Sequence, residues 1–473
     1  MTRRSLTGWG RTSPTSADIV PAADASVVED ALGRAGRRGV LARGLGRAYG
    51  DAAQNAGGTV LSVTAQGASI TIDQHGVASV SAATTIDDLI RAALPQGWFV
   101  PVTPGTRQVT IGGAVAADIH GKNHHVDGSF MSHVRSLSLI TPTGARRLSS
   151  PDPLFWATAG GMGLTGVVVS AEVALTPVTT SRIAVDTERT ADLEQTLTVM
   201  SDGDDRFRYS VCWIDCLTRG AHLGRSIVTR GDHAGVEALA PDAAEDPLAF
   251  APRRPLPAPP WAPSGLLNVA TITAFNEAWY RRAPRRERGA IQSIGQFFHP
   301  LDGIEGWNRA YGRRGFLQWQ ILIPFGSEET LRRIIERLAS ARCPSFVGVL
   351  KRFGPGNDGH LSFPGPGWTL ALDMPVGPAA LAPLLDELDD AVVSTGGRIY
   401  LAKDSRLRPE LVEAMYPRLA EWRQIRSAAD PQGVMNSDLA RRLRLLDPQG
   451  APPPAQPGSE PAGAGAGLNT LRL

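Results

Sequence analysis

Two glycine-rich loops constrain this chain more than any other feature of its sequence. The first loop, RGLGRAYGD, runs from Arg43 to Asp51, and the second, PGTRQVTIGGAVAADIHGKNHH, runs from Pro104 to His125. Glycine adopts backbone conformations with positive φ and lets the chain approach a ligand without an obstructing Cβ atom. Successive N–H groups in such turns form a nest that binds anions. Together the two loops predict a split cradle for a dinucleotide.

The first loop differs from the fingerprint of a nicotinamide dinucleotide site. It follows a short apolar strand, Val40 to Ala42, but the fingerprint needs a glycine where Tyr49 stands, and no acidic residue follows at the required spacing. A nicotinamide site is therefore disfavoured. In the second loop, Gly112 and Gly113 precede small residues that allow the backbone to pack closely against an isoalloxazine ring or a pyrophosphate.

Composition and charge exclude several classes of protein. The chain has 473 residues, of which 42% are hydrophobic and 20% charged, which is typical of a globular enzyme with two or three domains. Its formal net charge of +2 provides no electrostatic footprint for nucleic acid. No apolar stretch predicts a signal peptide or a membrane-spanning helix, so we expect a chain that is synthesised as a soluble protein.

Neither the cysteines nor the histidines predict a metal site or a disulfide framework. Cys212 and Cys216 are four residues apart without a second pair, and with Cys343 they make an odd number, so we expect small buried hydrophobic side chains. Three histidines follow one another in the second loop, but no carboxylate stands at ligand spacing. They are His120, His124 and His125.

The hydrophobic pattern predicts an α+β protein. We expect strands over Thr59 to Ser62, Val167 to Val173, Tyr209 to Ile214 and Phe316 to Pro324, and helices over Ser26 to Ala35 and over Thr85 to Leu94, the latter capped by Thr85. The predicted domains are a nucleotide-binding domain (1–180), a substrate domain (181–397) and a segment that completes the first domain (398–446). A proline-rich surface loop (251–265) should be mobile, and a Pro/Ala/Gly-rich tail (447–473) should be disordered.

The C-terminal stretch GGRIYLAKDSRL supplies a candidate base. We expect a strand over Arg398 to Ala402 that ends at Lys403. A desolvated lysine near a cofactor can act as a base or hold an anionic group, whereas an isolated lysine beside Asp404 is more often a surface residue. Gln318 and Gln320 are two residues apart in a predicted strand, so their side chains share one face of the strand. That face points either into a pocket or to solvent.

The pair of glycine-rich loops resembles flavoproteins of the vanillyl-alcohol-oxidase type. The resemblance implies a two-domain FAD-binding fold with a substrate domain built on an antiparallel sheet, with the FAD pyrophosphate on the first loop and the flavin along the second. Arg47 stands where many members carry a covalently attached histidine, which implies non-covalent FAD. A third glycine cluster, between Leu154 and Leu175, would run alongside the adenine and ribose of FAD. The implied FAD-binding residues are Arg43, Gly44, Leu45, Gly46, Arg47, Ala48, Tyr49, Gly105, Thr106, Arg107, Thr110, Gly112, Gly113, Ala117, His120, Gly121, His124, Gly163 and Tyr400.

A more specific resemblance extends from Trp9 to Leu446 and covers both loops, FLQWQILIP, LSFPGPGW and the segment Gly396 to Leu443. These motifs resemble the actinobacterial decaprenylphosphoryl-β-D-ribose 2′-oxidases, the FAD subunit of a 2′-epimerase in arabinan biosynthesis for the cell wall. The resemblance implies oxidation of the 2′-hydroxyl of a polyprenyl-phosphoryl pentose, a partner NAD(P)H-dependent short-chain reductase, and association with the membrane or cell envelope through the lipid.

The same resemblance assigns roles to residues of this chain. Lys403 would contact the 2′-hydroxyl, with His120 and Tyr49 beside the flavin and substrate. Gln318, Gln320 and Lys351 would face the sugar, and Tyr311 and Trp213 would line the pocket, although both aromatic residues fit a core equally well. Ala371 and Thr369 stand where many members carry cysteine and asparagine, which affects sensitivity to thiol-directed inhibitors. The alternatives are a sugar or alditol oxidase that uses oxygen and a non-catalytic glycolipid-binding protein that retains FAD.

Overall fold

The computed structural model describes residues 2–22, 24–64, 69–252, 255–259, 262–263 and 265–446. The predicted disordered tail lies outside the described residues, and the predicted mobile loop lies partly outside them. The α+β fold class predicted from the sequence is confirmed. The domain boundaries stay a prediction.

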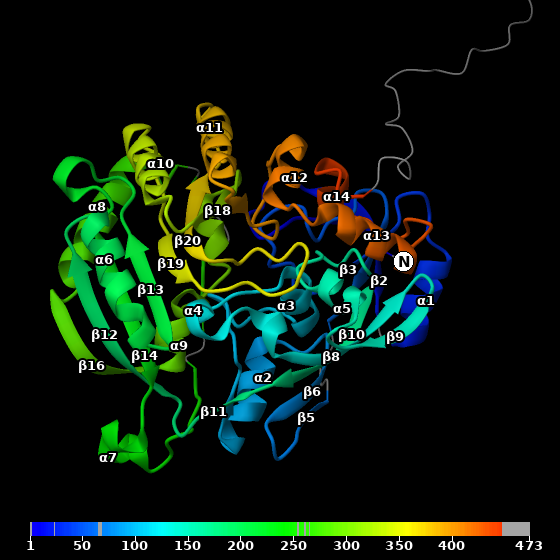
Figure 1. Cartoon of the computed structure of the whole chain (residues 1–473), viewed down its shortest axis with the longest axis horizontal. Helices are drawn as coiled ribbons and strands as arrows, with labels where there is room; N and C mark the ends of the chain where they lie inside the picture. Colours follow the sequence, from blue (N-terminus) through cyan, green and yellow to red (C-terminus); the bar gives the residue numbers. More distant parts are fainter. Residues whose placement is uncertain are drawn as a thin grey trace, which may run out of the picture.

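Two sheets form the part of the molecule that carries the glycine-rich loops (Figure 1). The four-stranded sheet has the order β1-β2-β4-β3 and the five-stranded antiparallel sheet the order β5-β6-β10-β8-β9. Their strands are β1 (Thr2–Leu6), β2 (Thr15–Pro21), β3 (Val40–Arg43), β4 (Thr59–Ser62), β5 (Ile70–Ile72), β6 (Val77–Ser81), β8 (Val134–Thr141), β9 (Gly144–Leu148) and β10 (Val167–Ala174). A short pair joins β7 (Trp98–Phe99) to β11 (Thr176–Pro177).

The helices of this part follow local sequence signals. The predicted helix with a Thr85 cap is confirmed as α2 (Ile86–Ala93), where the Thr85 side chain accepts from Asp88 N and the Asp88 carboxylate accepts from Thr85 N. Thr110 caps α3 in the second loop in the same way, accepting from Gly113 N at 3.2 Å. The other helices here are α1 (Ala25–Gly33), α3 (Ile111–Ala117), α4 (His124–Asp127) and α5 (Pro153–Thr158).

An eight-stranded sheet forms the other part, in the order β16-β12-β14-β13-β19-β20-β18-β21. The predicted strands Tyr209–Ile214 and Phe316–Pro324 are confirmed as β13 and β18. The other strands are β12 (Arg182–Thr190), β14 (Ser226–His233), β16 (Arg286–Ser293), β19 (Gly348–Phe353), β20 (Gly367–Pro375) and β21 (Arg398–Ile399). Its helices are α6 (Leu193–Gly203), α7 (Pro241–Ala244), α8 (Val269–Arg282), α9 (Ile294–Phe298), α10 (Glu328–Ser340) and α11 (Leu381–Ser394), and β15 (Leu256–Pro257) pairs with β17 (Ile304–Glu305).

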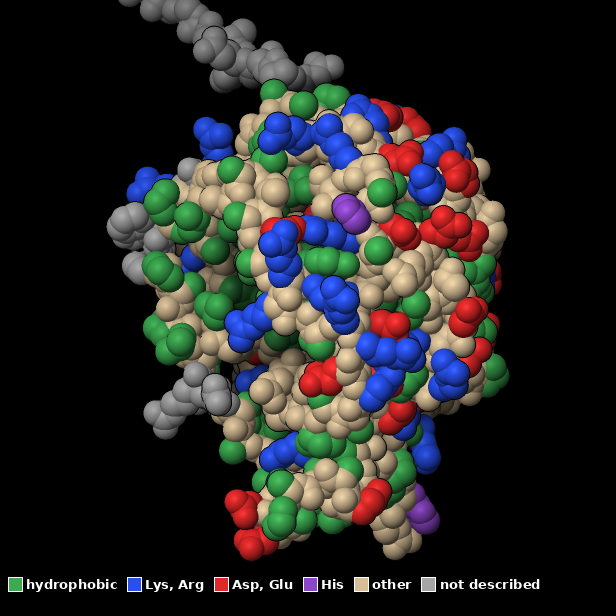
Figure 2. All heavy atoms as spheres, turned by 90° about the vertical axis from the view of Figure 1, so that its left-hand side faces the viewer, with side chains coloured by type: hydrophobic (Ala, Val, Ile, Leu, Met, Phe, Trp, Pro, Cys, Tyr) green, Lys and Arg blue, Asp and Glu red, His purple; other side chains and the backbone are tan. Residues whose placement is uncertain are grey.

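The eight-stranded sheet turns one face to its helices and the other to the glycine-rich loops. Alternate residues of β18 point to opposite faces: Trp319 and Ile321 belong to the core cluster under α10 and α11, whereas Gln318 and Gln320 line a cavity. Figure 1 shows α10 and α11 stacked outside β18 and β20. Seen from the α8 side, hydrophobic side chains border a hollow in the surface (Figure 2).

The last helices, α12 (Val412–Met415), α13 (Leu419–Ala429) and α14 (Asp438–Arg442), pack on the part that carries the loops (Figure 1). Trp422 on α13 donates to the carbonyl of Ala157 at 2.9 Å, and Arg442 pairs with Asp51 at 2.7 Å. The chain therefore returns from the eight-stranded sheet to the first glycine-rich loop.

The predicted strand over Arg398 to Ala402 is wrong in its length. Strand β21 covers only Arg398–Ile399. The carbonyl of Ala402 accepts from Tyr49 N at 3.0 Å, and the carbonyl of Tyr400 accepts from Lys403 N at 2.9 Å. These backbone groups bond to the first loop and to one another, so they do not bond to a neighbouring strand. Lys403 therefore lies in a turn.

Candidate active site

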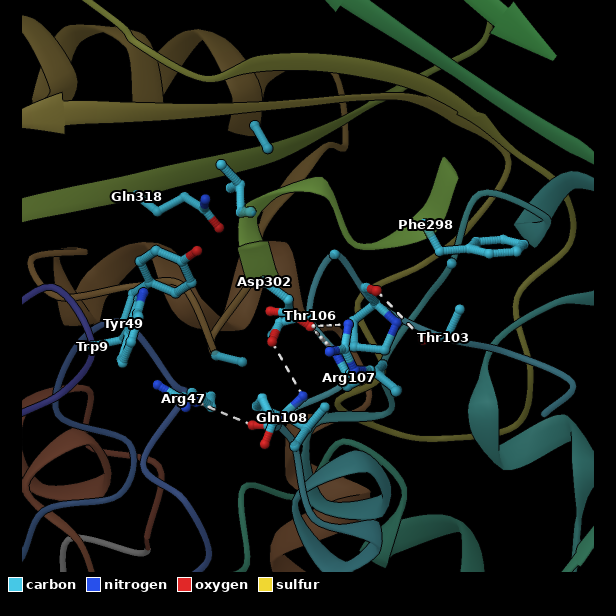
Figure 3. A pocket seen from close by; sticks show the side chains of 18 of the residues that line it. Trp9, Arg47, Tyr49, Thr103, Thr106, Arg107, Gln108, Phe298, Asp302 and Gln318 are labelled. Atoms are coloured by element: carbon cyan, nitrogen blue, oxygen red, sulfur yellow. Dashed lines mark hydrogen bonds and ion pairs between the residues drawn. The ribbon is translucent and has the colours of Figure 1, made fainter. Parts of the chain in front are cut away.

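A cavity of about 1290 Å³ lies between the two glycine-rich loops and the inner face of the eight-stranded sheet. Strands β13, β18, β19 and β20 form its sheet side, and the segment of α9 and η6 (Pro300–Gly303) borders it. Figure 3 shows the side chains of both loops and of this segment turned toward the same space. The cavity is where the sequence predicts the cofactor and the substrate.

Glycine is required at two positions of the first loop. Gly46 has a φ of +64°, and a Cβ atom there would lie 2.1 Å from the Nη2 atom of Arg43. At Gly50, a Cβ atom would lie 2.0 Å from the carbonyl oxygen of Asp404, in the turn that follows Lys403. The loop is therefore shaped by its own arginine and by the C-terminal segment.

The three arginines of the loops have different roles. Arg43 donates to the carbonyls of Ala53 and Thr7 at 2.7 and 2.8 Å, so its guanidinium supports the loop. Arg107 is similarly engaged by two aspartates, Asp87 at 2.6 Å and Asp302 at 3.5 Å, which ties η6 to the second loop (Figure 3).

Arg47 is the arginine best placed to meet an anionic ligand. It uses only its Nε atom, which donates to the carbonyl of Gln108 at 3.0 Å, and its Cζ atom lies 4.0 Å from the centre of the Trp9 ring. Within the described residues, its two Nη atoms make no hydrogen bond to the protein. They are left to donate to a phosphoryl group.

Space beside the glycines fits a flat cofactor. No atom lies within 4 Å of a Cβ placed on Gly105, and the nearest atom to one on Gly163 is 4.0 Å away. Both residues line the cavity. An FAD molecule would therefore lie directly against backbone here, with its pyrophosphate on the first loop.

His120 is enclosed by protein side chains. Its Nδ1 atom lies 3.1 Å from Lys351 Nζ, and its Nε2 atom lies 2.9 Å from the side-chain amide of Gln320. Burial lowers the pKa of His120 well below its ordinary value, and the Lys351 charge lowers it further. The amide nitrogen of Gln320 is the atom that faces His120 Nε2, and it also donates to Thr369 Oγ1 at 3.0 Å, so Lys351 and Gln320 hold the ring from its two nitrogen atoms.

The chain contains only three lysines, and all three line this cavity. Burial lowers the pKa of Lys122 and Lys351 to about 7 and that of Lys403 to about 8. All other basic side chains except histidine are arginines, which do not lose their proton in proteins. The cavity thus holds every amine side chain that can change charge near neutral pH.

Lys403 faces a buried carboxylate. Its Nζ atom lies 3.9 Å from the centre of the Tyr49 ring. Asp373 is fully buried on β20; one carboxylate oxygen accepts from the Gln318 amide, and its Oδ2 atom has no partner within the described part of the chain.

Lys403 and Asp373 influence each other without contact. Burial raises the pKa of Asp373 to about 7, and the carboxylate raises the pKa of Lys403 against the effect of burial. No ion pair of 4.0 Å or less joins these two described residues. Both residues line the same cavity, one with a basic and one with an acidic group.

Most of the predicted site residues lie on the cavity wall. The wall includes Arg43, Gly44, Leu45, Gly46, Arg47, Ala48, Tyr49, Gly105, Thr106, Arg107, Thr110, Gly112, Gly113, Ala117, His120, Gly121, Gly163, Trp213, Gln318, Gln320, Lys351, Tyr400 and Lys403. Ala371 also lines it, opposite Gln320 in the β18–β20 ladder. The hydroxyl of Tyr400 donates to the carbonyl of Ala117 at 2.7 Å, which joins the C-terminal turn to α3.

Two predicted site residues lie off the wall. The ring of Tyr311 stacks on Phe316 with 4.1 Å between the centroids, so it belongs to the aromatic layer behind Tyr49. His124 packs on Phe353 and accepts from Gly354 N at 3.2 Å, so it braces the second loop against β19. The side chains of Tyr311 and His124 are both held in packing contacts that involve residues distant in sequence.

Sequence reasoning missed two cavity residues, Asp373 and Lys122. The scarcity of lysine was a signal that could have singled out Lys122, and a lone aspartate within the apolar strand PGWTLALDMP could have singled out Asp373. All three cysteines are buried, as predicted, and Cys212 also borders the cavity. Within the described ranges, no three metal-binding side chains cluster, and no helix is long and apolar enough to cross a bilayer.

Comparison with known proteins agrees with this geometry. A model described as an FAD-binding domain matches residues 17–149, and one described as D-arabinono-1,4-lactone oxidase matches residues 376–443. Decaprenylphosphoryl-beta-D-ribose oxidase of Mycolicibacterium smegmatis is 45% identical over 94% of this chain and 98% of its own length. An uncharacterized protein of Streptomyces coelicolor is 44% identical over 76% and 100%, and cytokinin dehydrogenase 4 of Arabidopsis thaliana is 33% identical over 29% and 28%.

The fold and the matched models define an FAD-dependent oxidoreductase of the vanillyl-alcohol-oxidase type. Within that class, the chain belongs to the decaprenylphosphoryl-β-D-ribose oxidase family. The FAD cofactor predicted from the two glycine-rich loops is confirmed.

Proposed function

We propose that this protein oxidises the 2′-hydroxyl of decaprenylphosphoryl-β-D-ribose to the 2′-keto sugar, with FAD bound non-covalently. The observation that carries the proposal is that Lys403 and Asp373, two buried groups whose charges influence each other, line one cavity together with both glycine-rich loops. The 45% identity to a relative named for this substrate supports the choice of sugar. The reaction would be the first half of an epimerisation to the arabinose donor for cell-wall arabinan.

Non-covalent FAD is supported by the first loop, which contains no histidine between Arg43 and Asp51. Arg47 takes the superfamily's attachment position, and its guanidinium lies against Trp9. Bound FAD supplies the acceptor for the hydride that leaves C2′. Acid precipitation tests the attachment: all flavin should pass to the supernatant, and flavin that stays with the polypeptide would contradict the proposal.

Lys403 is proposed to take the proton of the 2′-hydroxyl. With a pKa of about 8, it is partly neutral at physiological pH and can accept a proton. Asp373, held by Gln318, would lie on the other side of the hydroxyl and stabilise the resulting ammonium. His120 is proposed to position Lys351 instead, because both of its ring nitrogens already have partners in the protein.

Lys351 and Gln320 are proposed to bind the rest of the substrate. The Lys351 ammonium has no carboxylate partner within 4.0 Å among the described residues, so an anionic phosphoryl group would compensate its charge. Gln320 is held between His120 and Thr369 and would be a rigid partner for a sugar hydroxyl. Trp213 would provide an apolar wall for the sugar ring.

The product requires a second enzyme. A 2′-keto sugar becomes an arabinose only after a hydride is added from the other face, which we assign to an NAD(P)H-dependent short-chain reductase. We also propose that the protein works at the membrane or cell envelope, because its lipid-linked substrate is anchored there.

The decisive experiment mixes the purified holoenzyme with decaprenylphosphoryl-β-D-ribose without oxygen. The flavin absorbance should bleach with one equivalent of substrate, and mass spectrometry should find a product lighter by two hydrogen atoms. No bleaching would overturn the proposed function. The match of residues 376–443 to a lactone oxidase favours one second candidate, a sugar oxidase that uses oxygen, which stoichiometric peroxide in air would identify.

A further inference from the structure

An apolar rim surrounds the opening of the cavity. We define it as Leu256, Phe275, Trp279 and Ile304, which are 73%, 36%, 46% and 47% exposed. Phe275, Trp279 and Ile304 also line the cavity, and Leu256 pairs with Ile304 between β15 and β17. Figure 2 shows hydrophobic side chains beside a hollow on this side of the molecule. A soluble surface rarely gathers large apolar side chains at one opening without a partner.

Helix α8 holds two aromatic side chains at the edge of the cavity. Phe275 and Trp279 are four residues apart, so they share one helix face, and their rings stack with 6.0 Å between centroids. Ile272 and Asn276 lie on the same side of the helix and fix it to the sheet, because Ile272 is buried and Asn276 donates to Asp215 at 2.8 Å. These contacts anchor α8 beside the aromatic pair, so that Phe275 and Trp279 border the cavity and stay partly exposed.

Positive charge accompanies the rim. The segment 269–293 contains five arginines and two glutamates, although the whole chain has a net charge of only +2. Arg282 lies three residues after Trp279 on the same helix face, is exposed and lines the cavity opening. Arg281, Arg286 and Arg288 pair with Glu277, Glu188 and Asp186, whereas Arg282 and Arg285 have no carboxylate within 4.0 Å among the described residues. The surface around the opening is therefore both apolar and basic.

We propose that this rim binds an anionic phospholipid bilayer, so that the cavity opens against the membrane. Tryptophan and phenylalanine side chains enter the interfacial region of a bilayer, and nearby arginines attract anionic headgroups. A lipid-linked sugar would then enter without its chain crossing water, a consequence that rests on the proposed function. A folded protein partner is less well matched, because the basic segment flanks an opening that the partner would block.

Vesicle flotation of the full-length holoenzyme tests the proposal. The wild type should float with vesicles of equal parts phosphatidylglycerol and phosphatidylcholine. It should float far less with phosphatidylcholine alone or in 0.5 M salt, about three times the ionic strength at which the screening length is 8 Å. Trp279→Ser and Arg282→Glu should each lower the partition coefficient at least about fivefold, the effect of one basic residue near an anionic surface.

Matched controls lie outside the rim. Phe325 is 41% exposed on the turn between β18 and α10, and Arg34 is an exposed residue directly after α1. Phe325→Ser and Arg34→Glu should float like the wild type. The flavin spectrum and melting temperature of each variant report whether it has folded. The proposal would be overturned if the rim variants floated as well as the wild type or if the wild type did not float. Rim variants that lose only dimerisation or binding of a reductase would also overturn it.

One further variant separates this proposal from the proposed function. Leu256 belongs to the rim but not to the cavity wall. Leu256→Ser should float less and still oxidise a water-soluble, short-chain phosphoryl ribose at the wild-type rate. Flotation of the wild type without turnover of either substrate would reject the proposed function alone. Turnover without flotation would reject the membrane surface alone.

Discussion

The ammonium of Lys403 lies 3.9 Å from the centre of the Tyr49 ring. The two residues come from opposite ends of the chain and are joined through the backbone, because Tyr49 N donates to the carbonyl of Ala402 at 3.0 Å. The first glycine-rich loop, which we propose to bind the cofactor, therefore also positions the proposed base. A change in the loop that moves Tyr49 would also move Lys403.

Replacement of Lys403 should stop the chemistry but not the binding of FAD. Lys403→Ala should keep the flavin and bleach at least about a hundredfold more slowly with substrate, the usual contribution of a positioned base. Lys403→Arg retains the charge but cannot lose its proton, so it should be equally slow. Stopped-flow absorbance measures both rates, and a wild-type rate in either variant would remove Lys403 as the base.

The pH dependence of kcat/KM should reflect the interaction between Lys403 and Asp373. The neutral amine is the proposed base, so kcat/KM should rise with pH, with an apparent pKa of about 8 that belongs to the pair. In Asp373→Asn the carboxylate that raises the pKa of Lys403 is gone, so the rise should move to lower pH. An unmoved profile in Asp373→Asn would show that the two groups do not interact during turnover.

A side chain at Gly46 should abolish cofactor binding. Gly46→Val places a β-branched residue at a φ of +64°, with its Cβ 2.1 Å from Arg43 Nη2. The purified variant should be colourless and should fail to take up added FAD in a fluorescence titration. Gly36→Ala is the control, because no atom lies within 4 Å of its new Cβ. A yellow Gly46→Val protein would contradict this role of the loop.

Amine-reactive reagents should reveal the cavity. At pH 8, the neutral fractions of Lys122 and Lys351 are large because burial lowers the pKa of both to about 7. Acetylation of the apoprotein by a small active ester should reach these lysines besides the N-terminal amine, and bound FAD should protect them. Peptide mass spectrometry measures the protection. Equal labelling with and without FAD would show that the flavin lies elsewhere.

The wild-type protein should resist inhibitors that need a thiol in the pocket. Ala371 lies on the cavity wall, where its methyl group offers no nucleophile. Burial raises the pKa of Cys212 and Cys343 to about 12 and that of Cys216 well above its ordinary value, so all three thiols are inert.

Intact-protein mass spectrometry tests this resistance. A nitroaromatic inhibitor that is reduced at the flavin should leave no adduct on the wild type and one adduct on Ala371→Cys. An adduct on the wild-type protein would show that the pocket is placed wrongly.

Local signals in the sequence predicted much of the fold. The cap at Thr85 and the strands Tyr209–Ile214 and Phe316–Pro324 were all found, because caps and alternating burial depend on neighbours along the chain. The predicted strand at Arg398 to Ala402 was too long, because the carbonyl of Ala402 bonds to Tyr49 in the first loop and the carbonyl of Tyr400 bonds to Lys403.

The sequence by itself determined that the chain carries two glycine-rich loops for a dinucleotide and a lysine close to the end of a strand. Only the tertiary structure decided the roles of the charged residues. Arg43 and Arg107 support loops because their partners converge from distant segments. Lys403 has a lowered pKa and faces Asp373 because folding buries both. Desolvation and the fields of nearby charges exist only after distant parts of the chain have packed together.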